Sequence, residues 1–286
     1  MRNNIQIIAL DLDGTLLNCK KRVSKRNAKA LATAAENGVF IVPTTGRLAA
    51  GLPDDVKAMP FIRYVIGANG ARITDTWEHK DLMNEAIPNS RVLEILDLAK
   101  KYDALYDCYI DESGYISADM LDRAADYTID EHHLELMHNT RKPVDNLDAY
   151  VRDNNLDALK VQFLFRSTED RDAAIKEIQE ALPDCLVTSS YPNNLEINSV
   201  NANKGAALKY LSDYLNIPIK HTMSFGDGTN DISMLEIAGI GVAMENAAPE
   251  VFPHGALIAP DCNNDGVGRI IEQYCGSQRR LNKRYA

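Results

Sequence analysis

The chain has 286 residues, 45% of them hydrophobic and 25% charged, which is typical of a globular protein long enough for two domains. Its formal net charge of −10 argues against a nucleic-acid-binding surface, because phosphate backbones are bound through clustered lysine and arginine. A basic cluster comes at the end of the chain, where a solvated tail is expected: Arg279, Arg280, Lys283 and Arg284.

The five cysteines are scattered and none forms a Cys-x-x-Cys pair, which argues against a disulfide framework or a zinc knuckle and suits reduced thiols. No segment approaches the roughly 20 apolar residues of a membrane span. The apolar run at residues 5–10 is too short for a signal peptide. We therefore expect a cytoplasmic protein whose partners include neither nucleic acid nor a membrane.

The first part of the chain alternates short apolar runs with helical patterns. We predict strands at residues 5–10, 39–43 and 64–67, with helices at residues 25–37 and 49–59 between them. Gly38 is the C-terminal signal of the first helix. This βαβαβ order is typical of a doubly wound parallel sheet.

The same alternation returns in the last third of the chain. Helices are predicted at residues 202–215, 232–238 and 267–274, and strands at residues 222–225, 240–243 and 256–258. These strands are continuous apolar runs, as expected for parallel strands that are buried on both faces.

The middle of the chain follows a different pattern. Amphipathic helices are predicted at residues 91–102 and 169–182, and strands at residues 105–110, 158–165 and 185–189. Pro88 and Pro192 punctuate the two junctions. We interpret this segment as an α/β domain of residues 87–189, inserted into a Rossmann-like α/β core of residues 1–86 and 190–286.

Two carboxylates, Asp11 and Asp13, directly follow the first predicted strand, and Gly14 and Thr15 come next. Ligands of open α/β sheets bind beyond the carboxyl ends of the strands, so both carboxylates are well placed. The glycine turn leaves backbone N–H groups free for a phosphate. The alternative interpretation is an ordinary polar turn after a strand. It readily explains one aspartate at this place, but it explains two aspartates directly after an apolar strand less well.

Two further positions suit a bound phosphate. Thr45 and Gly46 follow the second strand, where a hydroxyl can bond a phosphoryl oxygen, although Thr-Gly is also common in turns. Lys204 lies at the start of the helix predicted at residues 202–215. A cation is unfavourable beside this positive end of the helix dipole unless an anion is bound there as well. A solvated surface position remains the simpler interpretation for any single lysine.

Asp227 and Asp231 lie four residues apart across a glycine-containing turn from strand to helix. Both can point into one pocket, and carboxylate oxygens are the ligands that Mg²⁺ selects. Asp231 would also serve as a helix N-cap. The four signals together supply a nucleophile, a positive clamp and a metal site, which is the set that phosphoryl transfer needs.

These motifs resemble those of the haloacid dehalogenase (HAD) superfamily, in the family's order. They are Asp-x-Asp-Gly-Thr from Asp11, a threonine at Thr45, Lys204, and Gly-Asp-x-x-Asn-Asp ending at Asp231. The runs Thr45-Gly46-Arg47, Gly67-Ala68-Asn69-Gly70-Ala71 and Asn203-Lys204-Gly205 resemble the Cof-type branch of class IIB phosphatases. That branch carries its cap between the second and third motifs, where the inserted domain is predicted.

The resemblance implies an Mg²⁺-dependent phosphatase with a role for each motif residue. Asp11 would attack phosphorus and form an aspartyl-phosphate, while Asp13 would protonate the leaving oxygen and then activate water. The implied metal ligands are Asp11, the backbone carbonyl of Asp13, Asp227 and Asp231. The implied substrate-binding residues are Thr45, Gly46, Arg47, Asn69, Lys204 and Asn230. A turn-forming role for Asn69 is an equal alternative.

We expect a phosphohydrolase that acts on small phosphorylated metabolites, with sugar phosphates favoured, as a monomer or homodimer. A phosphomutase or phosphotransferase is the alternative, but a mutase would need a strongly basic cap and the predicted insert is rich in acids. A non-catalytic phosphate-binding module would be expected to lack Asp11 or Asp13, and both are present.

Overall fold

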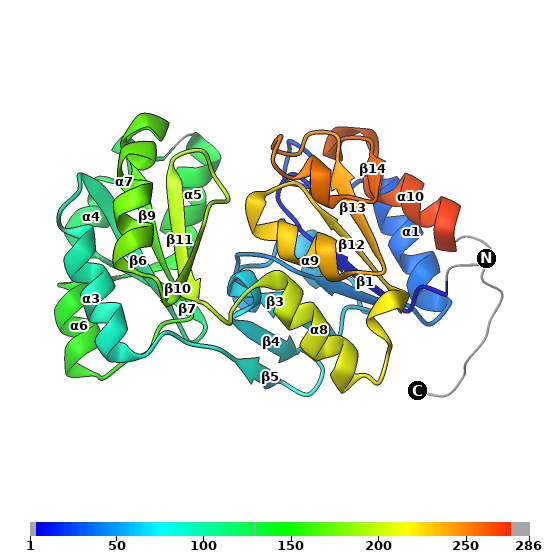
Figure 1. The fold of residues 1–286 in the computed structure, drawn as a ribbon, viewed down its shortest axis with the longest axis horizontal. Helices are drawn as coiled ribbons and strands as arrows, with labels where there is room; N and C mark the ends of the chain where they lie inside the picture. The colour runs from blue at the N-terminus through cyan, green and yellow to red at the C-terminus, as the bar shows by residue number, and fades with distance from the viewer. Residues whose placement is uncertain (1–3, 129, 276–286) are drawn as a thin grey trace. The chain divides into compact units, whose positions relative to one another are not determined.

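The computed structural model describes residues 4–128 and 130–275. The chain forms two compact units (Figure 1). The core unit comprises Met1–Met83 and Asn203–Ala286, and the inserted unit comprises Asn84–Ala202. The basic cluster at residues 279–284 lies outside the described residues.

A five-stranded sheet lies at the centre of the core unit (Figure 1). Its strands, in spatial order, are β14 (Leu257–Ala259), β13 (Ile240–Met244), β12 (Thr222–Gly226), β1 (Ile7–Leu10) and β2 (Phe40–Pro43). All four neighbouring pairs are parallel. The α/β class with a parallel core sheet, expected from the alternating pattern, is confirmed.

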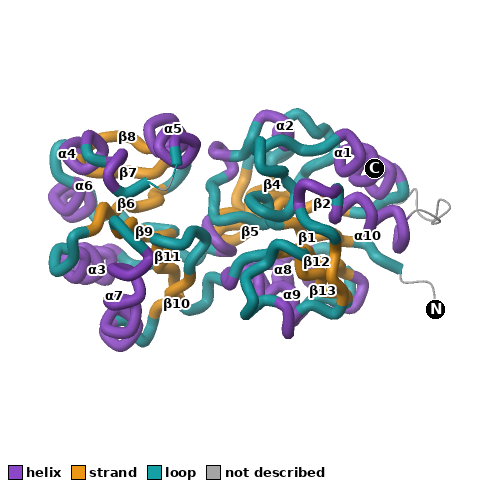
Figure 2. Tube along the Cα trace, turned by 90° about the horizontal axis from the view of Figure 1, so that it is seen from above, coloured by secondary structure: helices purple, strands orange, loops and turns teal. Residues whose placement is uncertain are grey.

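Helices cover both faces of this sheet (Figure 2). They are α1 (Lys25–Glu36), α8 (Lys204–Tyr214), α9 (Ile232–Ile237) and α10 (Gly266–Cys275). α1 and α10 share a hydrophobic cluster with Ile8 and Leu10 of β1, whereas α8 and α9 share one with Ile7 and Ala9. Because successive side chains of a strand point to opposite faces, β1 is buried on both, which explains its unbroken apolar sequence.

The prediction of a single helix at residues 49–59 is wrong. This segment forms a 3₁₀ turn at Ala49–Gly51 and the short helix α2 at Asp54–Lys57. Leu52 between them is extended, with ψ of 143°. The cause is Pro53, because proline disfavours the α conformation in the residue before it.

The predicted strand at Tyr64–Gly67 exists as β3, but it lies outside the five-stranded sheet. It pairs antiparallel with β4 (Arg72–Asp75), and β5 (Lys80–Asn84) follows as the third strand of that sheet. A parallel bridge between Thr44 and Ile66 connects β3 to the end of β2. The last strand of the predicted βαβαβ run therefore begins a separate antiparallel sheet instead of joining the parallel one.

The inserted unit is built on a six-stranded sheet. In spatial order the strands are β10 (Cys185–Thr188), β11 (Asn194–Ser199), β9 (Lys160–Phe165), β6 (Ala104–Ile110), β7 (Ser113–Ser117) and β8 (Arg141–Val144). The pairs are antiparallel except β7 with β8. Its helices are α3 (Asn89–Ala99), α4 (Ala118–Asp122), α5 (Glu131–Thr140), α6 (Leu147–Asp153) and α7 (Thr168–Ala181). In the described part of the chain, no helix is long and apolar enough to cross a membrane.

The second junction between the units lies at Ala202–Asn203, thirteen residues after the predicted boundary at 189–190. The reason is β11, which pairs with β10 and β9 and so belongs to the sheet of the inserted unit. Pro192 lies in the turn between β10 and β11 rather than in a linker. The first junction, before Asn84, lies close to the predicted one.

Asp75 at the end of β4 is a buried carboxylate that holds the turn of the β4–β5 hairpin. Its Oδ2 accepts from Nη2 of Arg63 at 2.8 Å, and its Oδ1 accepts from the backbone N–H groups of Trp77 and Glu78, each at 3.1 Å. Burial raises the pKa of Asp75, but these donors outweigh it and lower the pKa below its ordinary value.

We predict that Asp75→Asn lowers the free energy of unfolding at pH 7 by about 1–3 kcal/mol, because a buried charged acceptor is lost. A carboxyl with a lowered folded-state pKa stabilises the fold above its unfolded pKa of about 3.9. That stabilisation is lost as the pH falls through the folded-state pKa. Urea unfolding should therefore show the gap between wild type and variant shrinking below about pH 4.

Asp81→Asn in the same hairpin is the matched control. Asp81 pairs with Arg72 at 2.6 Å but is partly exposed, and such pairs contribute about 0–1 kcal/mol. A loss for Asp75→Asn that equals the control, or that does not change with pH, would contradict the role of Asp75.

Candidate active site

The parallel pairing of β1 and β12 brings the first and fourth motifs together. Leu10 and Phe225 are partners in the register, and the N–H of Asp11 donates to the carbonyl of Phe225 at 3.0 Å. Asp11 therefore leaves its strand beside the end of β12, which is followed by Asp227. Both carboxylates lie at the carboxyl edge of the sheet, where ligands of open α/β sheets bind.

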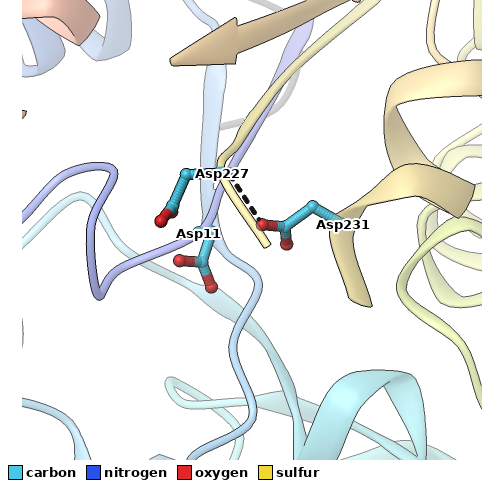
Figure 3. Close-up of side chains that lie close together, drawn as sticks. All are labelled: Asp11, Asp227 and Asp231. Carbon is cyan, nitrogen blue, oxygen red and sulfur yellow. Dashed lines mark hydrogen bonds between the residues drawn. The ribbon is translucent and has the colours of Figure 1, made fainter. Parts of the chain in front are cut away.

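Three carboxylates gather at this edge: those of Asp11, Asp227 and Asp231 (Figure 3). One oxygen from each lies within 4.8 Å of the others. Asp231 is fixed by its Oδ2, which accepts from the backbone N–H groups of Asp227 and Gly228, each at 2.9 Å. The glycine-containing turn of the fourth motif thus places both its aspartates, as the spacing predicts.

Lys204 is the cation of this cluster. Its Nζ lies 2.7 Å from Oδ1 of Asp11 and 2.5 Å from Oδ1 of Asp231, and its side chain is fully buried. It is the first residue of α8, whose N-cap Asn203 accepts from the N–H of Ala206 at 2.8 Å. The anions that hold a lysine at this helix terminus are therefore carboxylates of the chain itself.

One ammonium does not neutralise three carboxylates, two of which are buried. Burial raises the pKa of Asp11 well above its usual range, because the attraction of Lys204 is outweighed by burial together with repulsion from Asp231 and Asp227. Burial alone would lower the pKa of Lys204, but Asp11 and Asp231 raise it above the ordinary value, so the ammonium stays charged.

Asp227 is held by the first motif. The hydroxyl of Thr15 donates to its Oδ1 at 2.6 Å. Gly14 has φ of +83°, and a Cβ there would lie 2.2 Å from Oδ2 of Asp227, so only glycine fits. Burial, with repulsion from Asp231, raises the pKa of Asp227 to about 7.

The donor set fits a hard divalent cation. Among the described residues, Oδ2 of Asp11 and Oδ2 of Asp227 have no hydrogen-bond donor, whereas both oxygens of Asp231 already accept from the protein. Oxygen ligands and an excess of negative charge are what Mg²⁺ or Ca²⁺ requires. Asp11 and Asp227 offer the freer ligand atoms, and Asp231 mainly positions Lys204 and the turn.

The side chain of Asp13 lies outside the carboxylate cluster. It accepts from Nε of Arg47 at 2.8 Å, from Nη2 of Arg47 at 3.0 Å and from Nζ of Lys21 at 2.9 Å. Burial alone would raise the pKa of Asp13, but these cations lower it to about 2. Asp13 is therefore ionised in this arrangement and has no proton to donate.

The remaining predicted residues lie in loops that border the cluster. Thr45 is buried after β2, and its Oγ1 accepts from the N–H of Arg47 at 3.2 Å, with Gly46 between them. The buried amides of Asn69 and Asn230 bond each other, Nδ2 of Asn230 to Oδ1 of Asn69, at 3.1 Å. Asn69 has φ of 59°, so its backbone does form a turn, and its side chain contacts the fourth motif.

Comparison with known proteins agrees with this geometry. Residues 8–271 match the family model described as haloacid dehalogenase-like hydrolase. The chain belongs to this family. Phosphatase YwpJ of Bacillus subtilis (strain 168) is 33% identical over 284 residues, covering 94% of this chain and 99% of that one.

Two other relatives support the assignment to the haloacid dehalogenase-like hydrolases. A solved structure of a haloacid dehalogenase-like hydrolase from B. subtilis superposes with a TM-score of 0.82 at 30% identity, covering 94% of this chain and 99% of that one. The 5-amino-6-(5-phospho-D-ribitylamino)uracil phosphatase YcsE of B. subtilis (strain 168) is 26% identical, covering 95% of this chain and 96% of that one. The resemblance inferred from the four motifs is confirmed.

Sequence reasoning missed two contacts of this hydrolase site. Lys21 binds Asp13, but nothing in a lysine between Lys20 and Arg22 signals this, because the contact depends on a loop in which Lys21 has φ of 55°. Asn246 donates from Nδ2 to the carbonyl of Gly14 at 2.8 Å and accepts from the N–H of Cys262 at 3.0 Å. The run Met244-x-Asn246-Ala247 after β13 was the available signal.

We predict that Lys204→Met lowers the free energy of unfolding by about 3–5 kcal/mol in the presence of EDTA, because it leaves buried carboxylates without a counter-charge. Urea unfolding followed by circular dichroism measures this loss. The double variant Lys204→Met with Asp231→Asn should recover part of it, because it removes one of those carboxylates.

Lys209→Met on the same helix is the control. Lys209 is exposed and pairs with Asp213 one turn on, so its loss should not exceed about 0.5 kcal/mol. If Lys204→Met costs no more than Lys209→Met, the buried ammonium does not hold the cluster together.

Proposed function

We propose that this chain is an Mg²⁺-dependent phosphohydrolase that removes phosphate from small phosphorylated metabolites, with sugar phosphates favoured. The reaction would pass through an aspartyl-phosphate on Asp11. The observation that carries the proposal is the position of Asp11, which leaves a buried strand with one oxygen bound to Lys204 and the other without a donor among the described residues.

Asp11 is the nucleophile in the first half of the reaction. Its free Oδ2 forms a bond to phosphorus while the bond from phosphorus to the ester oxygen breaks. Lys204 binds Oδ1 of Asp11, and its ammonium group can also stabilise the negative charge that develops on the phosphoryl oxygens. Thr45 accepts a backbone bond at Oγ1, which leaves its hydroxyl hydrogen to donate to a phosphoryl oxygen.

Asp13 is the residue that we assign to both proton transfers of the reaction. The leaving oxygen needs a proton as the ester bond breaks, and the attacking water must lose one in the second half. Bound to Arg47 and Lys21, Asp13 is ionised but only weakly basic, because these cations lower its pKa. Both tasks require Asp13 to take up a proton, which becomes easier when the two cations release it.

A divalent cation would be held by Asp11 and Asp227, with the backbone carbonyl of Asp13 and the carboxylate of Asp231 as further candidate ligands. When bound, Mg²⁺ supplies positive charge that offsets repulsion between an anionic nucleophile and an anionic substrate. The raised pKa values of Asp11 and Asp227 support this, because they indicate a site with too little positive charge. Hard oxygen donors favour Mg²⁺ over softer metals.

The relatives support a phosphomonoester substrate. Phosphatase YwpJ is named for phosphate removal, and YcsE is named for a substrate that carries a phosphorylated ribityl chain. Both align over nearly the whole of this chain. A phosphorylated sugar or alditol is therefore the substrate class that we favour.

We predict that Asp11→Asn reduces phosphate release from an aryl phosphate by roughly 10³-fold or more, because an amide cannot attack phosphorus. Asp213→Asn, an exposed aspartate on α8, should leave the rate within about twofold. Initial rates of phosphate release, measured on folded protein, decide the outcome.

The same assay tests the metal. Thorough EDTA treatment should abolish turnover, and added Mg²⁺ should restore it. Activity that survives in Asp11→Asn would overturn the nucleophile, while activity that survives EDTA would remove the metal from the mechanism. An isomerised phosphate ester in place of free phosphate would favour a mutase.

A further inference from the structure

The loop that follows β13 in the core unit contacts two of the motif loops that build the candidate active site. Nδ2 of Asn246 donates to the carbonyl of Gly14 in the first motif at 2.8 Å. Two residues further on, the backbone N–H of Ala248 donates to the carbonyl of Asp227 in the fourth motif at 3.0 Å. We call residues 245–248 the bracket loop, because this short segment is bonded to both motifs.

The bracket loop is itself held at the carboxyl edge of the parallel sheet. The N–H of Glu245 donates to the carbonyl of Ala259, the last residue of β14, at 2.8 Å. Oδ1 of Asn246 accepts from the N–H of Cys262 at 3.0 Å, which fixes the orientation of the amide. An amide that is held at its oxygen can set the position of the carbonyl that its nitrogen binds.

The carbonyl of Gly14 is important because of the peptide group to which it belongs. A peptide group is planar, so this carbonyl and the N–H of Thr15 move together. The N–H of Thr15 donates to the carbonyl of Leu12 at 3.3 Å, which is longer than the usual range of about 2.7–3.2 Å. The 2.8 Å bond from Asn246 is shorter, so it holds this peptide more closely than the bond within the turn does.

The side chain of Thr15 connects this peptide to Asp227. Its hydroxyl donates to Oδ1 of Asp227 at 2.6 Å, which leaves Oδ2 as the freer ligand atom. A Cβ on Gly14 would lie 2.2 Å from that Oδ2, so the turn and the carboxylate are closely packed. A small rotation of the peptide between Gly14 and Thr15 would therefore change the position of the carboxylate.

Burial does not account for the contacts of Asn246. Asn246 is exposed, so water could satisfy its amide in place of the two backbone groups. Ordering an exposed side chain also costs conformational entropy. Residues that orient the ligands of a metal without binding it commonly determine the affinity for that metal. The position of Asn246, two bonded steps from Asp227, fits such a role.

We propose that Asn246 is a positioning residue of the metal site, which keeps Asp227 oriented for a divalent cation through the Gly14–Thr15 peptide and the hydroxyl of Thr15. The inference rests on the proposed metal-dependent function and adds to it a residue that acts through others. Asn246 thus affects the affinity for the cation rather than the chemical step.

Calorimetric titration of the metal-free, full-length protein with Mn²⁺ measures this affinity directly. Mn²⁺ takes the same oxygen ligands as Mg²⁺. Asn246→Leu is similar in size but bonds neither backbone group, and it should raise the dissociation constant by about tenfold. Asn246→Ala should have the same effect, so either variant decides the test if the other fails to fold. Circular dichroism in EDTA identifies the folded variants.

Turnover of p-nitrophenyl phosphate gives a second readout. At low Mg²⁺ the Asn246 variants should be slower than wild type. Saturating Mg²⁺ should restore kcat to within about twofold, because excess cation fills a site of lower affinity. KM for the ester should stay within about twofold throughout. A defect in the chemical step would not respond to the Mg²⁺ concentration.

Asn263→Leu is the matched control. Asn263 is also an exposed asparagine that connects two loops, because its Oδ1 accepts from the N–H of Cys19 at 2.9 Å. Cys19 lies outside the four motifs. The control should therefore keep the dissociation constant for Mn²⁺ within about twofold of the wild-type value.

A double variant tests the route through Thr15. Thr15→Val removes the hydroxyl that connects the peptide to Asp227. If Asn246 acts by this route, adding Asn246→Leu to Thr15→Val should change the dissociation constant by less than about threefold, because effects that share one pathway are not additive.

Several results would overturn the inference: an unchanged dissociation constant in both Asn246 variants, a loss of kcat that saturating Mg²⁺ does not restore, or a full tenfold effect in the Thr15→Val background. Each of these leaves the proposed function intact if wild type binds Mn²⁺ and turns over the ester. Turnover by a wild type that binds no divalent cation would instead refute the metal-dependent function, and the role of Asn246 with it.

Discussion

The site of this protein depends on one buried ammonium group. Lys204 reaches from the start of α8 to Asp11 at the end of β1, a contact between residues 193 positions apart, and it also binds Asp231. Without that cation the carboxylates that gather at the sheet edge would repel one another in a medium that screens charge poorly. The two halves of the core unit are thus joined by the same ion pairs that orient the carboxylate of Asp11.

The ammonium leaves the negative charge only partly neutralised, and this imbalance is what gives the site its chemistry. Asp11 and Asp227 have raised pKa values, whereas Asp13, only two residues from Asp11, has a lowered one because Arg47 and Lys21 surround it. Neighbouring aspartates in opposite electrostatic environments are suited to different tasks. One group of carboxylates is short of positive charge and attracts a cation, while Asp13 keeps its own counter-charges.

Much of this was predictable from the sequence, for physical reasons. Asp11 and Asp227 each come directly after an apolar strand, so the sequence predicts that both lie at the carboxyl edge of the parallel sheet. The short glycine-containing turn after Asp227 then determines the position of Asp231. The contact of Lys21 with Asp13 was not predictable, because it depends on the path of an irregular loop. The second domain boundary was also misplaced, because Pro192 marks a hairpin turn as readily as a linker. The bond of Asn246 to Gly14 appears only when strand neighbours are known, since the pattern along one strand does not reveal its partners.

We propose that Asp11 itself becomes phosphorylated during turnover. Rapid acid quenching of the full-length protein mixed with a sugar phosphate and Mg²⁺, followed by mass spectrometry of the peptide that contains Asp11, detects this intermediate. A phosphoryl group is expected on Asp11 in wild type. With p-nitrophenyl phosphate as the substrate, whose leaving group needs no proton, it should accumulate further when Asp13 is replaced by Asn, because only the activation of water is then slowed. Steady release of phosphate with no phosphorylated Asp11 in either protein would contradict it.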